Sequence, residues 1–185
     1  MIADVEKETQ SRMQQAVDHA REDLSTIRTG RAPPAMFNRL NADYYGAPTP
    51  LQQLATFNSP DPRTMLITPF DRSAMKAITT AIRESDLGVN PTDDGRVIRV
   101  ILPVLTEERR RDYVKLAKSK AEESRVSVRG VRRKAKEALD RIKRDGEAGE
   151  DDVKRAEDRL DKLAKRYVDQ VDKLLDAKEK ELLEV

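Results

Sequence analysis

The sequence predicts an α+β protein in which a bundle of three long helices is interrupted by an inserted domain of mixed helix and strand. Composition divides the 185 residues in this way, because all nine prolines and all three phenylalanines lie between Pro33 and Pro103. About 20% of residues 31–104 are charged, against about half of the rest of the chain. Since both ends share one composition and the middle has another, residues 31–104 are predicted to be inserted into a helical domain made of residues 1–30 and 105–185.

Three segments carry apolar residues at steps of three and four, as one face of a helix does. They are residues 2–28, 106–145 and 150–184. The mean step in the second segment is about 3.5 residues, the period at which helices bury a continuous stripe against one another. The predicted stripe of this segment comprises Val114, Ala117, Ala121, Ser124, Val128, Val131, Ala135, Ala138 and Ile142, and that of the third segment comprises Val153, Ala156, Leu160, Leu163, Tyr167, Val171 and Leu174. Leu116, Val126 and Leu139 are expected to lie off the main stripe.

The inserted segment shows shorter, mixed patterns. Residues 40–44, 64–67 and 96–102 alternate or are rich in β-branched residues, which predicts strands, and residues 46–50 contain a glycine and two prolines that are expected to break the first of them. Asp71 is a predicted helix cap, followed by an apolar face at helical spacing formed by Met75, Ile78 and Ile82.

Composition also excludes several classes of protein. The chain has no cysteine, which removes disulfides, thiol nucleophiles and thiolate metal sites and fits a reducing cytoplasm. No run approaches the roughly 20 apolar residues that span a bilayer. The first eight residues have no apolar core of a signal peptide, so neither a membrane nor secretion is expected.

Candidates for catalysis or metal binding are few. His19 is the only histidine and lies on a predicted helix, where a solvated surface residue is expected. The seven glycines never form a phosphate-cradling loop, which argues against a nucleotidase. Asp93-Asp94 and the acidic run at residues 150–152 could bind a hard metal, but acids at turns and helix starts are usually caps. We therefore predict a protein that is not an enzyme and has neither a metal nor a cofactor.

The positive signal is the charge of the second helical segment. The net charge is +7 over residues 106–146 and −4 over residues 147–185, so the total of +2 conceals a dipole. Arg125, Arg129, Arg132 and Lys136 recur at steps of four, three and four residues, which places them on one outward face of the helix, and Arg133 lies on its flank. We call these five residues the cationic stripe.

Two interpretations of the cationic stripe are equally compatible with charge alone. Guanidinium groups bind anionic oxygens two at a time, which favours a phosphate-binding surface. The same side chains could instead form ion pairs with the acidic third helix. No aromatic residues interleave with the stripe, which disfavours base stacking on single strands and favours the backbone of folded RNA.

The junction between the two predicted domains carries further basic residues. Arg28 and Arg31 flank it, with Gly30 on one crossing of the chain and Pro103 on the other. We predict a hinge here, made of Thr29, Gly30 and Arg31 on the first crossing and of Leu102, Pro103, Val104, Leu105 and Thr106 on the second.

Six segments in this order resemble motifs of the bacterial ribosome recycling factor family. They are Ile27-Arg28-Thr29-Gly30-Arg31-Ala32, Tyr44-Tyr45-Gly46-Ala47-Pro48-Thr49-Pro50-Leu51, Phe70-Asp71-Arg72-Ser73, Asp86-Leu87-Gly88-Val89-Asn90-Pro91, Leu105-Thr106-Glu107-Glu108-Arg109-Arg110 and Val128-Arg129-Gly130-Val131-Arg132-Arg133. The resemblance spans essentially the whole chain. It implies an L-shaped protein with a long antiparallel three-helix bundle and an inserted β/α/β sandwich on a two-stranded hinge.

The resemblance also implies a function. Such factors enter the post-termination 70S ribosome and, with elongation factor G and its GTP hydrolysis, split the subunits and release them from mRNA. The implied contacts with large-subunit rRNA fall on Arg28, Arg31, Arg129, Arg132 and Arg133, and we add Arg125 and Lys136 because they share the stripe. A cytoplasmic monomer is expected. The alternative is a non-enzymatic coiled-coil protein that binds RNA or acts as a chaperone, which self-association would distinguish.

The chain departs from the family pattern at two positions of the second helix. Gly130 stands where the family usually has Asn, and Lys134 stands where it often has an acidic residue. Glycine costs a helix interior about 1 kcal/mol relative to alanine, and Lys134 adds positive charge beside the stripe. The second crossing has a single proline, Pro103, where many relatives have more.

Overall fold

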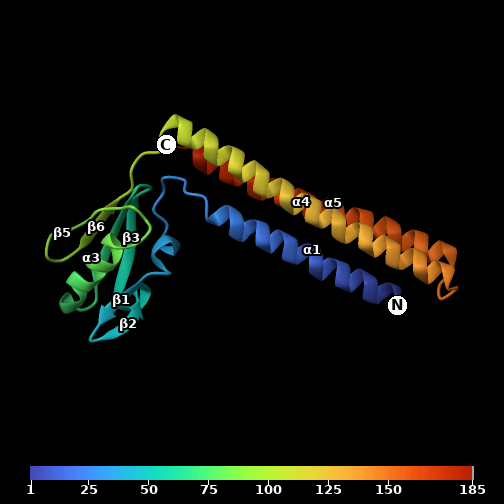
Figure 1. The fold of residues 1–185 in the computed structure, drawn as a ribbon, viewed down its shortest axis with the longest axis horizontal. Helices are drawn as coiled ribbons and strands as arrows, with labels where there is room; N and C mark the ends of the chain where they lie inside the picture. Colours follow the sequence, from blue (N-terminus) through green and yellow to red (C-terminus); the bar gives the residue numbers. More distant parts are fainter. Residues whose placement is uncertain (185) are drawn as a thin grey trace. The chain divides into compact units, whose positions relative to one another are not determined.

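A computed structural model describes residues 1–184, which form two compact units. The first is made of residues 1–28 and 107–184, and the second of residues 29–106. The first unit is a helical bundle and the second combines antiparallel sheets with short helices (Figure 1). The predicted α+β class, with a three-helix bundle and a small mixed domain inserted into it, is therefore confirmed.

The bundle consists of α1 (Ile2–Ser25), α4 (Glu107–Arg144) and α5 (Glu150–Leu183), which lie side by side over most of their lengths (Figure 1). At 1.5 Å per residue the two longer helices extend over about 57 and 51 Å. A short turn joins α4 to α5, so these two helices run antiparallel, and Gly146 adopts a φ of 68° in that turn. The start of α1 packs at the same end, where Ile2 and Val5 contact the core formed by α4 and α5.

Small side chains fill much of the bundle core. Ala117, Ala121, Ala156 and Ala20 are fully buried, so the helix backbones approach closely. The predicted stripes are confirmed in outline and wrong in detail. Leu139, expected off the stripe of α4, is fully buried. On α5, Ala164 and Leu175 are buried, while the predicted Leu163 and Leu174 beside them are half-buried. A helix in contact with two neighbours buries a face wider than one stripe, which explains these shifts by one residue.

The second unit contains two antiparallel sheets. Strands β3 (Ala55–Asp61), β4 (Thr64–Pro69), β6 (Ile98–Ile101) and β5 (Pro91–Asp93) form a four-stranded sheet in that order, and β1 (Asn41–Tyr44) pairs with β2 (Ala47–Pro50) in a separate hairpin. The helical elements are η1 (Pro34–Phe37), α2 (Leu51–Leu54), η2 (Arg72–Ala74) and α3 (Met75–Arg83). Strands β3 and β5 escaped prediction because both contain a proline and neither shows a clear alternation of apolar and polar residues.

The expectation that residues 46–50 only break a strand is wrong. Tyr45 and Gly46 both have positive φ, 51° and 81°, as the two central residues of a tight hairpin turn do. Residues 47–50 then return as β2, with Tyr44 opposite Ala47 and Asn41 opposite Pro50. Both strands of a two-stranded sheet are edges, and an edge tolerates the missing N–H groups of Pro48 and Pro50.

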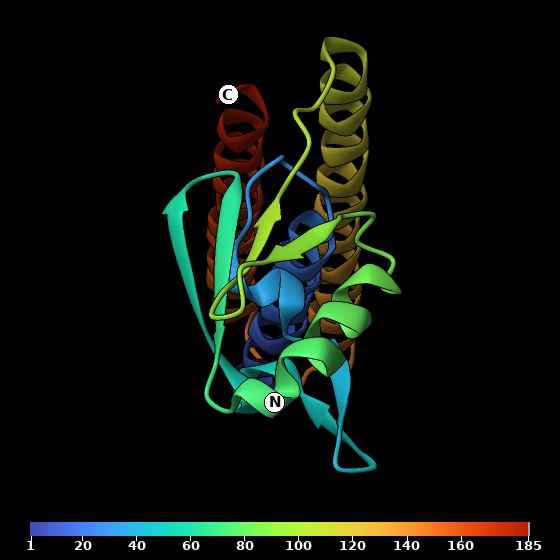
Figure 2. The same ribbon diagram turned by 90° about the vertical axis from the view of Figure 1, so that its left-hand side faces the viewer.

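Large side chains fill the core of the second unit. Figure 2 shows α3 beside the strands of this unit, and Ile78 and Ile82 of α3 are fully buried with Met65, Ile67 and Ile98 of the four-stranded sheet. Asp71 caps the start of η2, as predicted for the helix that follows, because its Oδ1 accepts a hydrogen bond of 2.9 Å from the N–H of Ser73. The unit therefore has a compact core of its own.

Candidate nucleic-acid interface

Helix α4 presents the cationic stripe because its other face is buried. Ser124, Val128 and Ala135 are buried against the bundle, whereas Arg129 and Arg133 are exposed and Arg125, Arg132 and Lys136 are half-buried. Arginine and lysine supply six of the 13 residues from 124 to 136, and both favour helix. Gly130 does not break the helix, and a Cβ at this position would meet no atom within 4 Å. All five side chains are thus displayed on one continuous element.

The first half of the stripe is closely paired with carboxylates. The Arg125 guanidinium lies 2.7 Å from Asp172 Oδ1 on α5 and 3.0 Å from Glu122 Oε2 on its own helix. Arg129 lies 3.4 Å from the other oxygen of Glu122. Burial by itself lowers the pKa of Arg125, but the hydrogen bonds with Asp172 and Glu122 outweigh it and raise the pKa above its usual value. Two cations therefore face two carboxylates here, and the local charge is balanced.

The second half of the stripe is paired less completely. Arg132 Nε and Lys136 Nζ lie 2.9 and 3.0 Å from the same oxygen, Asp161 Oδ1, on α5. Lys136 also donates a hydrogen bond of 3.3 Å to Asp161 Oδ2. Arg133 forms no ion pair with any residue that the structure describes. Two cations share one carboxylate and Arg133 has none, so this half keeps a net positive charge.

The sequence left ion pairing and phosphate binding as equal interpretations, and the structure separates them along the stripe. Pairing with the acidic helix accounts for Arg125, whereas positive charge remains around Arg132, Arg133 and Lys136. Glu122 could have been found from its distance of three residues to Arg125, since such pairs are neighbours on a helix. Asp161 and Asp172 could not, because the alignment of α4 with α5 decides which acids face the stripe.

Arg28 and Arg31, the other two basic candidates, belong to different units. Arg28 follows α1 in the bundle and Arg31 is the third residue of the second unit, and both side chains are exposed. Between them Gly30 adopts a φ of 78°, which favours glycine, and Thr29 is buried.

Both crossings of the chain are tied to one turn of the second unit. Ala32 N–H donates to Pro62 O, and Leu102 N–H donates to Arg63 O, each at 2.8 Å. The Arg63 guanidinium in turn donates to Leu102 O, at 3.2 Å from Nε and 2.9 Å from Nη2. No pattern in the sequence indicated this role of Arg63. Leu102, assigned to the predicted hinge, is buried and fixed within the second unit.

The candidates for catalysis have ordinary structural roles. His19 is exposed and lies 3.4 Å from Asp23 on the same helix. Asp94 accepts hydrogen bonds of 2.9 Å from the N–H groups of Val97 and Arg96, and these bonds lower its pKa. Asp93 accepts one from Gly95 N–H at 3.2 Å. These acids are turn caps.

The acidic start of α5 is explained in the same way. Glu150 lies 2.9 Å from Lys143 across the turn, and Asp151 and Asp152 stand in the first turn, where carboxylates stabilise a helix N-terminus. Among residues 1–184 no group of three or more His, Asp or Glu side chains could hold a metal ion. Nor does any helix in that range combine the length and apolar character needed to cross a bilayer.

Comparisons with known proteins agree over the whole chain. A family model described as ribosome recycling factor matches residues 20–183. The chain is 61% identical to the ribosome-recycling factor of Beutenbergia cavernae and 58% identical to that of Corynebacterium jeikeium, in each case over 100% of both proteins.

Two solved structures are also similar. A solution structure of ribosome recycling factor aligns with a TM-score of 0.80 and 43% identity, covering 100% of this chain and 98% of the other. The Thermus thermophilus ribosome recycling factor aligns with a TM-score of 0.68 and 41% identity over 100% of both chains. That factor is described with Escherichia coli elongation factor G on the E. coli post-termination complex.

Proposed function

The chain belongs to the ribosome recycling factor family, and we propose that it acts in the way that name describes. It binds the post-termination ribosome and, together with elongation factor G, splits the subunits and releases them from mRNA. The GTP is hydrolysed by the elongation factor, so the chain itself is not an enzyme. The observation that carries this proposal is the full-length match at 58–61% identity to ribosome-recycling factors. A coiled-coil chaperone is not favoured, because a match over the whole chain accounts for both units.

Elongation factor G and the ribosome are the partners that this function requires. The similar Thermus factor is described on a post-termination complex with elongation factor G. Since translating ribosomes work in the cytoplasm, the chain acts there, as a monomer. Depletion of polysomes by this protein, elongation factor G and GTP, with each omitted in turn, tests the function. Polysomes that persist with all three present would contradict it.

Large-subunit rRNA is the ligand of the cationic stripe in this proposal, with Arg28 and Arg31 as further contacts. The support is geometric, because Arg129 and Arg133 are exposed on α4 and positive charge remains around Arg132 and Lys136. Arg125 contributes mainly by holding the first half of the stripe in place, since it is bound to Asp172 and Glu122.

Arg132→Ala tests the docking surface. It should weaken binding to isolated large subunits about five- to tenfold and reduce the slope of log K against log salt by nearly one, because each phosphate contact releases about one counterion. Arg141→Ala is the matched control. Arg141 is exposed on the same helix, but it lies two and a half turns from Arg132 and therefore on the opposite side of the helix. Equal effects of the two substitutions would contradict docking by the stripe.

A change in the relative position of the two units is the second part of the proposal. The hinge was expected at residues 29–31 and 102–106. Because Leu102 is hydrogen-bonded to Arg63 within the second unit, we limit the hinge on the second crossing to residues 103–106. The chain has no cysteine, so one cysteine introduced into each unit can form a defined cross-link. The cross-linked protein should bind ribosomes and fail to split them. Splitting at the normal rate would contradict the hinge.

A further inference from the structure

The two halves of the cationic stripe differ in how firmly they are paired. Arg125 has a side chain only 19% exposed and hydrogen bonds to two carboxylates, so its geometry is fixed within the bundle. The side chains of Arg132 and Asp161 are 42% and 44% exposed. Ion pairs between side chains on a protein surface contribute little to folding, although Asp161 Oδ1 itself is covered. Exchange of a carboxylate for a phosphate is therefore easier at Arg132 than at Arg125.

Contact geometry at Asp161 points the same way. Asp161 Oδ1 lies within ion-pair distance of Arg132 and Lys136, yet it accepts no hydrogen bond with good alignment from any described residue. The attraction between Arg132 and Asp161 is thus Coulombic, without the aligned hydrogen bonds of a bidentate pair. Asp161 keeps both cations close together without using the full hydrogen-bonding capacity of the guanidinium.

We propose that Asp161 is an internal competitor of the rRNA phosphate: it holds Arg132 and Lys136 in their binding position on the free protein and lowers their affinity for RNA. The inference rests on the function proposed above. When a phosphate approaches, it must replace or share the attraction that Asp161 already supplies. The carboxylate therefore weakens the bound state relative to the free protein and accelerates dissociation.

Such a competitor suits a factor that must leave the ribosome after each cycle. An unopposed cluster of Arg132, Arg133 and Lys136 beside Lys134 would bind phosphates tightly and release them slowly at low salt. One carboxylate among them reduces the affinity without changing the shape of the surface. Asp161 comes from α5, so the helix that packs beside the stripe also sets the strength of its binding.

Asp161→Asn is the direct test, because it removes the charge and keeps the size of the side chain. It should bind isolated large subunits about three- to fivefold more tightly than the unchanged protein at 100 mM salt, with a correspondingly slower dissociation rate. Asp169→Asn is the matched control. It changes the net charge by the same amount on the same helix, but Asp169 is exposed and forms no ion pair with the described residues, so its effect should be much smaller.

Two further variants separate competition from a structural role. Asp161→Glu keeps the charge and should bind like the unchanged protein. In a background of Arg132→Ala with Lys136→Ala, Asp161→Asn should give no gain beyond that of Asp169→Asn, since the cations that it would release are absent. The thermal unfolding midpoint of each variant confirms that it is folded.

The outcomes distinguish this inference from the proposed function. Unchanged or weaker binding by folded Asp161→Asn, with Arg132→Ala still impaired, would overturn the competitor and leave docking intact. Equal gains from Asp161→Asn and Asp169→Asn would also overturn it, because net charge alone would then explain the effect. If Arg132→Ala with Lys136→Ala binds normally, docking by the stripe itself fails.

Discussion

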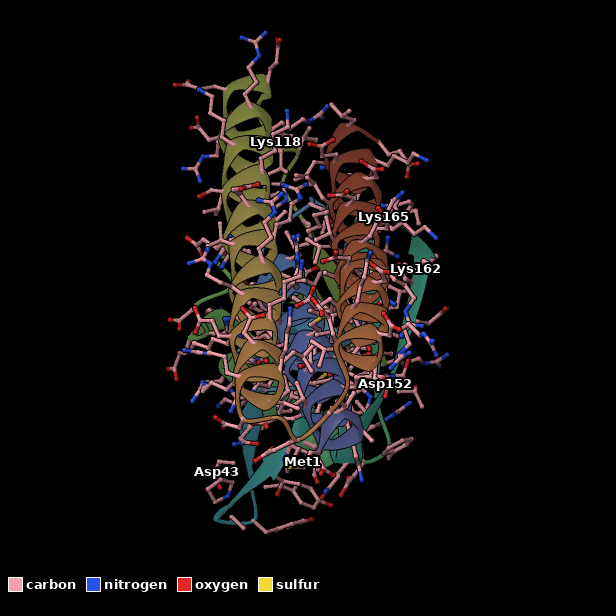
Figure 3. All side chains as sticks on the ribbon, turned by 90° about the vertical axis from the view of Figure 1, so that its right-hand side faces the viewer. Met1, Asp43, Lys118, Asp152, Lys162 and Lys165 are labelled. Atoms are coloured by element: carbon pink, nitrogen blue, oxygen red, sulfur yellow. The ribbon has the colours of Figure 1, made fainter. Side chains whose placement is uncertain are left out.

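The bundle and the inserted unit are stabilised in opposite ways. In the bundle, fully buried alanines such as Ala117, Ala121 and Ala156 let three helices approach closely, and charged side chains other than Lys178 lie at least partly exposed. In the inserted unit, Phe37, Leu51 and Met65 and several isoleucines fill one compact core. Side chains of the bundle, including the labelled Lys118 of α4 and Lys162 and Lys165 of α5, project all around the helices (Figure 3). The bundle therefore presents a charged surface, whereas the inserted unit maintains a defined shape.

Deleting a large side chain should damage the inserted unit most. Phe37→Ala removes a fully buried ring that stacks on Phe57 at 5.8 Å, and should lower the free energy of unfolding of this unit by about 3–5 kcal/mol. Urea unfolding measures the change. Phe70→Ala is the control, since Phe70 is 68% exposed, and it should cost less than about 0.5 kcal/mol. Similar losses at the two positions would contradict the assigned core.

Adding volume should damage the bundle. Ala121→Leu inserts three carbons where the side chain is fully buried between helices, and overpacking of this kind costs about 1–3 kcal/mol. Ala177→Leu, at an exposed position of α5, should be nearly neutral. Circular dichroism during thermal unfolding reports on both, because most of the helix belongs to the bundle. A bundle that accepts leucine at residue 121 without loss would be packed less closely than described.

Removing Arg63 should loosen the second crossing of the chain. Arg63→Ala deletes two hydrogen bonds from the guanidinium to Leu102 O and should destabilise the inserted unit by about 1–2 kcal/mol. Hydrogen exchange at the amide of Leu102 should accelerate, while amides of α4 should not change. Arg63→Lys should be intermediate, since lysine can reach one acceptor without the planar fork. Unchanged exchange would mean that the backbone bond alone fixes Leu102.

The inserted unit should lose stability at high pH. Tyr44 donates a hydrogen bond of 2.8 Å to Asp71 Oδ2, and this bond raises the pKa of Tyr44 to about 12 from about 10. Because the neutral hydroxyl is the form stabilised by folding, its contribution is complete below pH 10 and is lost as the pH rises through 12. Absorbance of tyrosinate should show a titration near pH 12 that disappears in Tyr44→Phe. An absorbance change near pH 10 that Tyr44→Phe removes would contradict the bond.

Asp71 should make the stability of the inserted unit depend on pH in acid as well. The hydrogen bonds that Asp71 accepts from Ser73 N–H and from the Tyr44 hydroxyl lower its pKa. Stability from Asp71 is therefore present at neutral pH and is lost as the pH falls through its lowered pKa. Asp71→Asn should remove this acid dependence and leave the bundle unaffected.

Composition and periodicity were enough to predict the division into two units, the three long helices and the outward position of the cationic stripe. These features can be predicted locally, because apolar and charged residues recur at steps of three and four along each helix and mark its buried and exposed faces. Family membership could also be predicted, because six motifs spread over the chain resemble those of one family. Gly130 did not disturb α4, since a single glycine costs a long helix little.

Tertiary structure alone decided which charges remain on the stripe. Asp172 is 47 residues from Arg125 and Asp161 is 25 from Lys136, and only the alignment of α4 with α5 brings them into contact. The same reason explains the burial of Leu139 and the anchoring of Leu102 by Arg63, which lies 39 residues away. Local periodicity specifies a helix and its faces, but packing decides which distant residue each side chain contacts. Packing of α5 against α4 therefore neutralises one half of the cationic stripe and leaves the other half with a net positive charge.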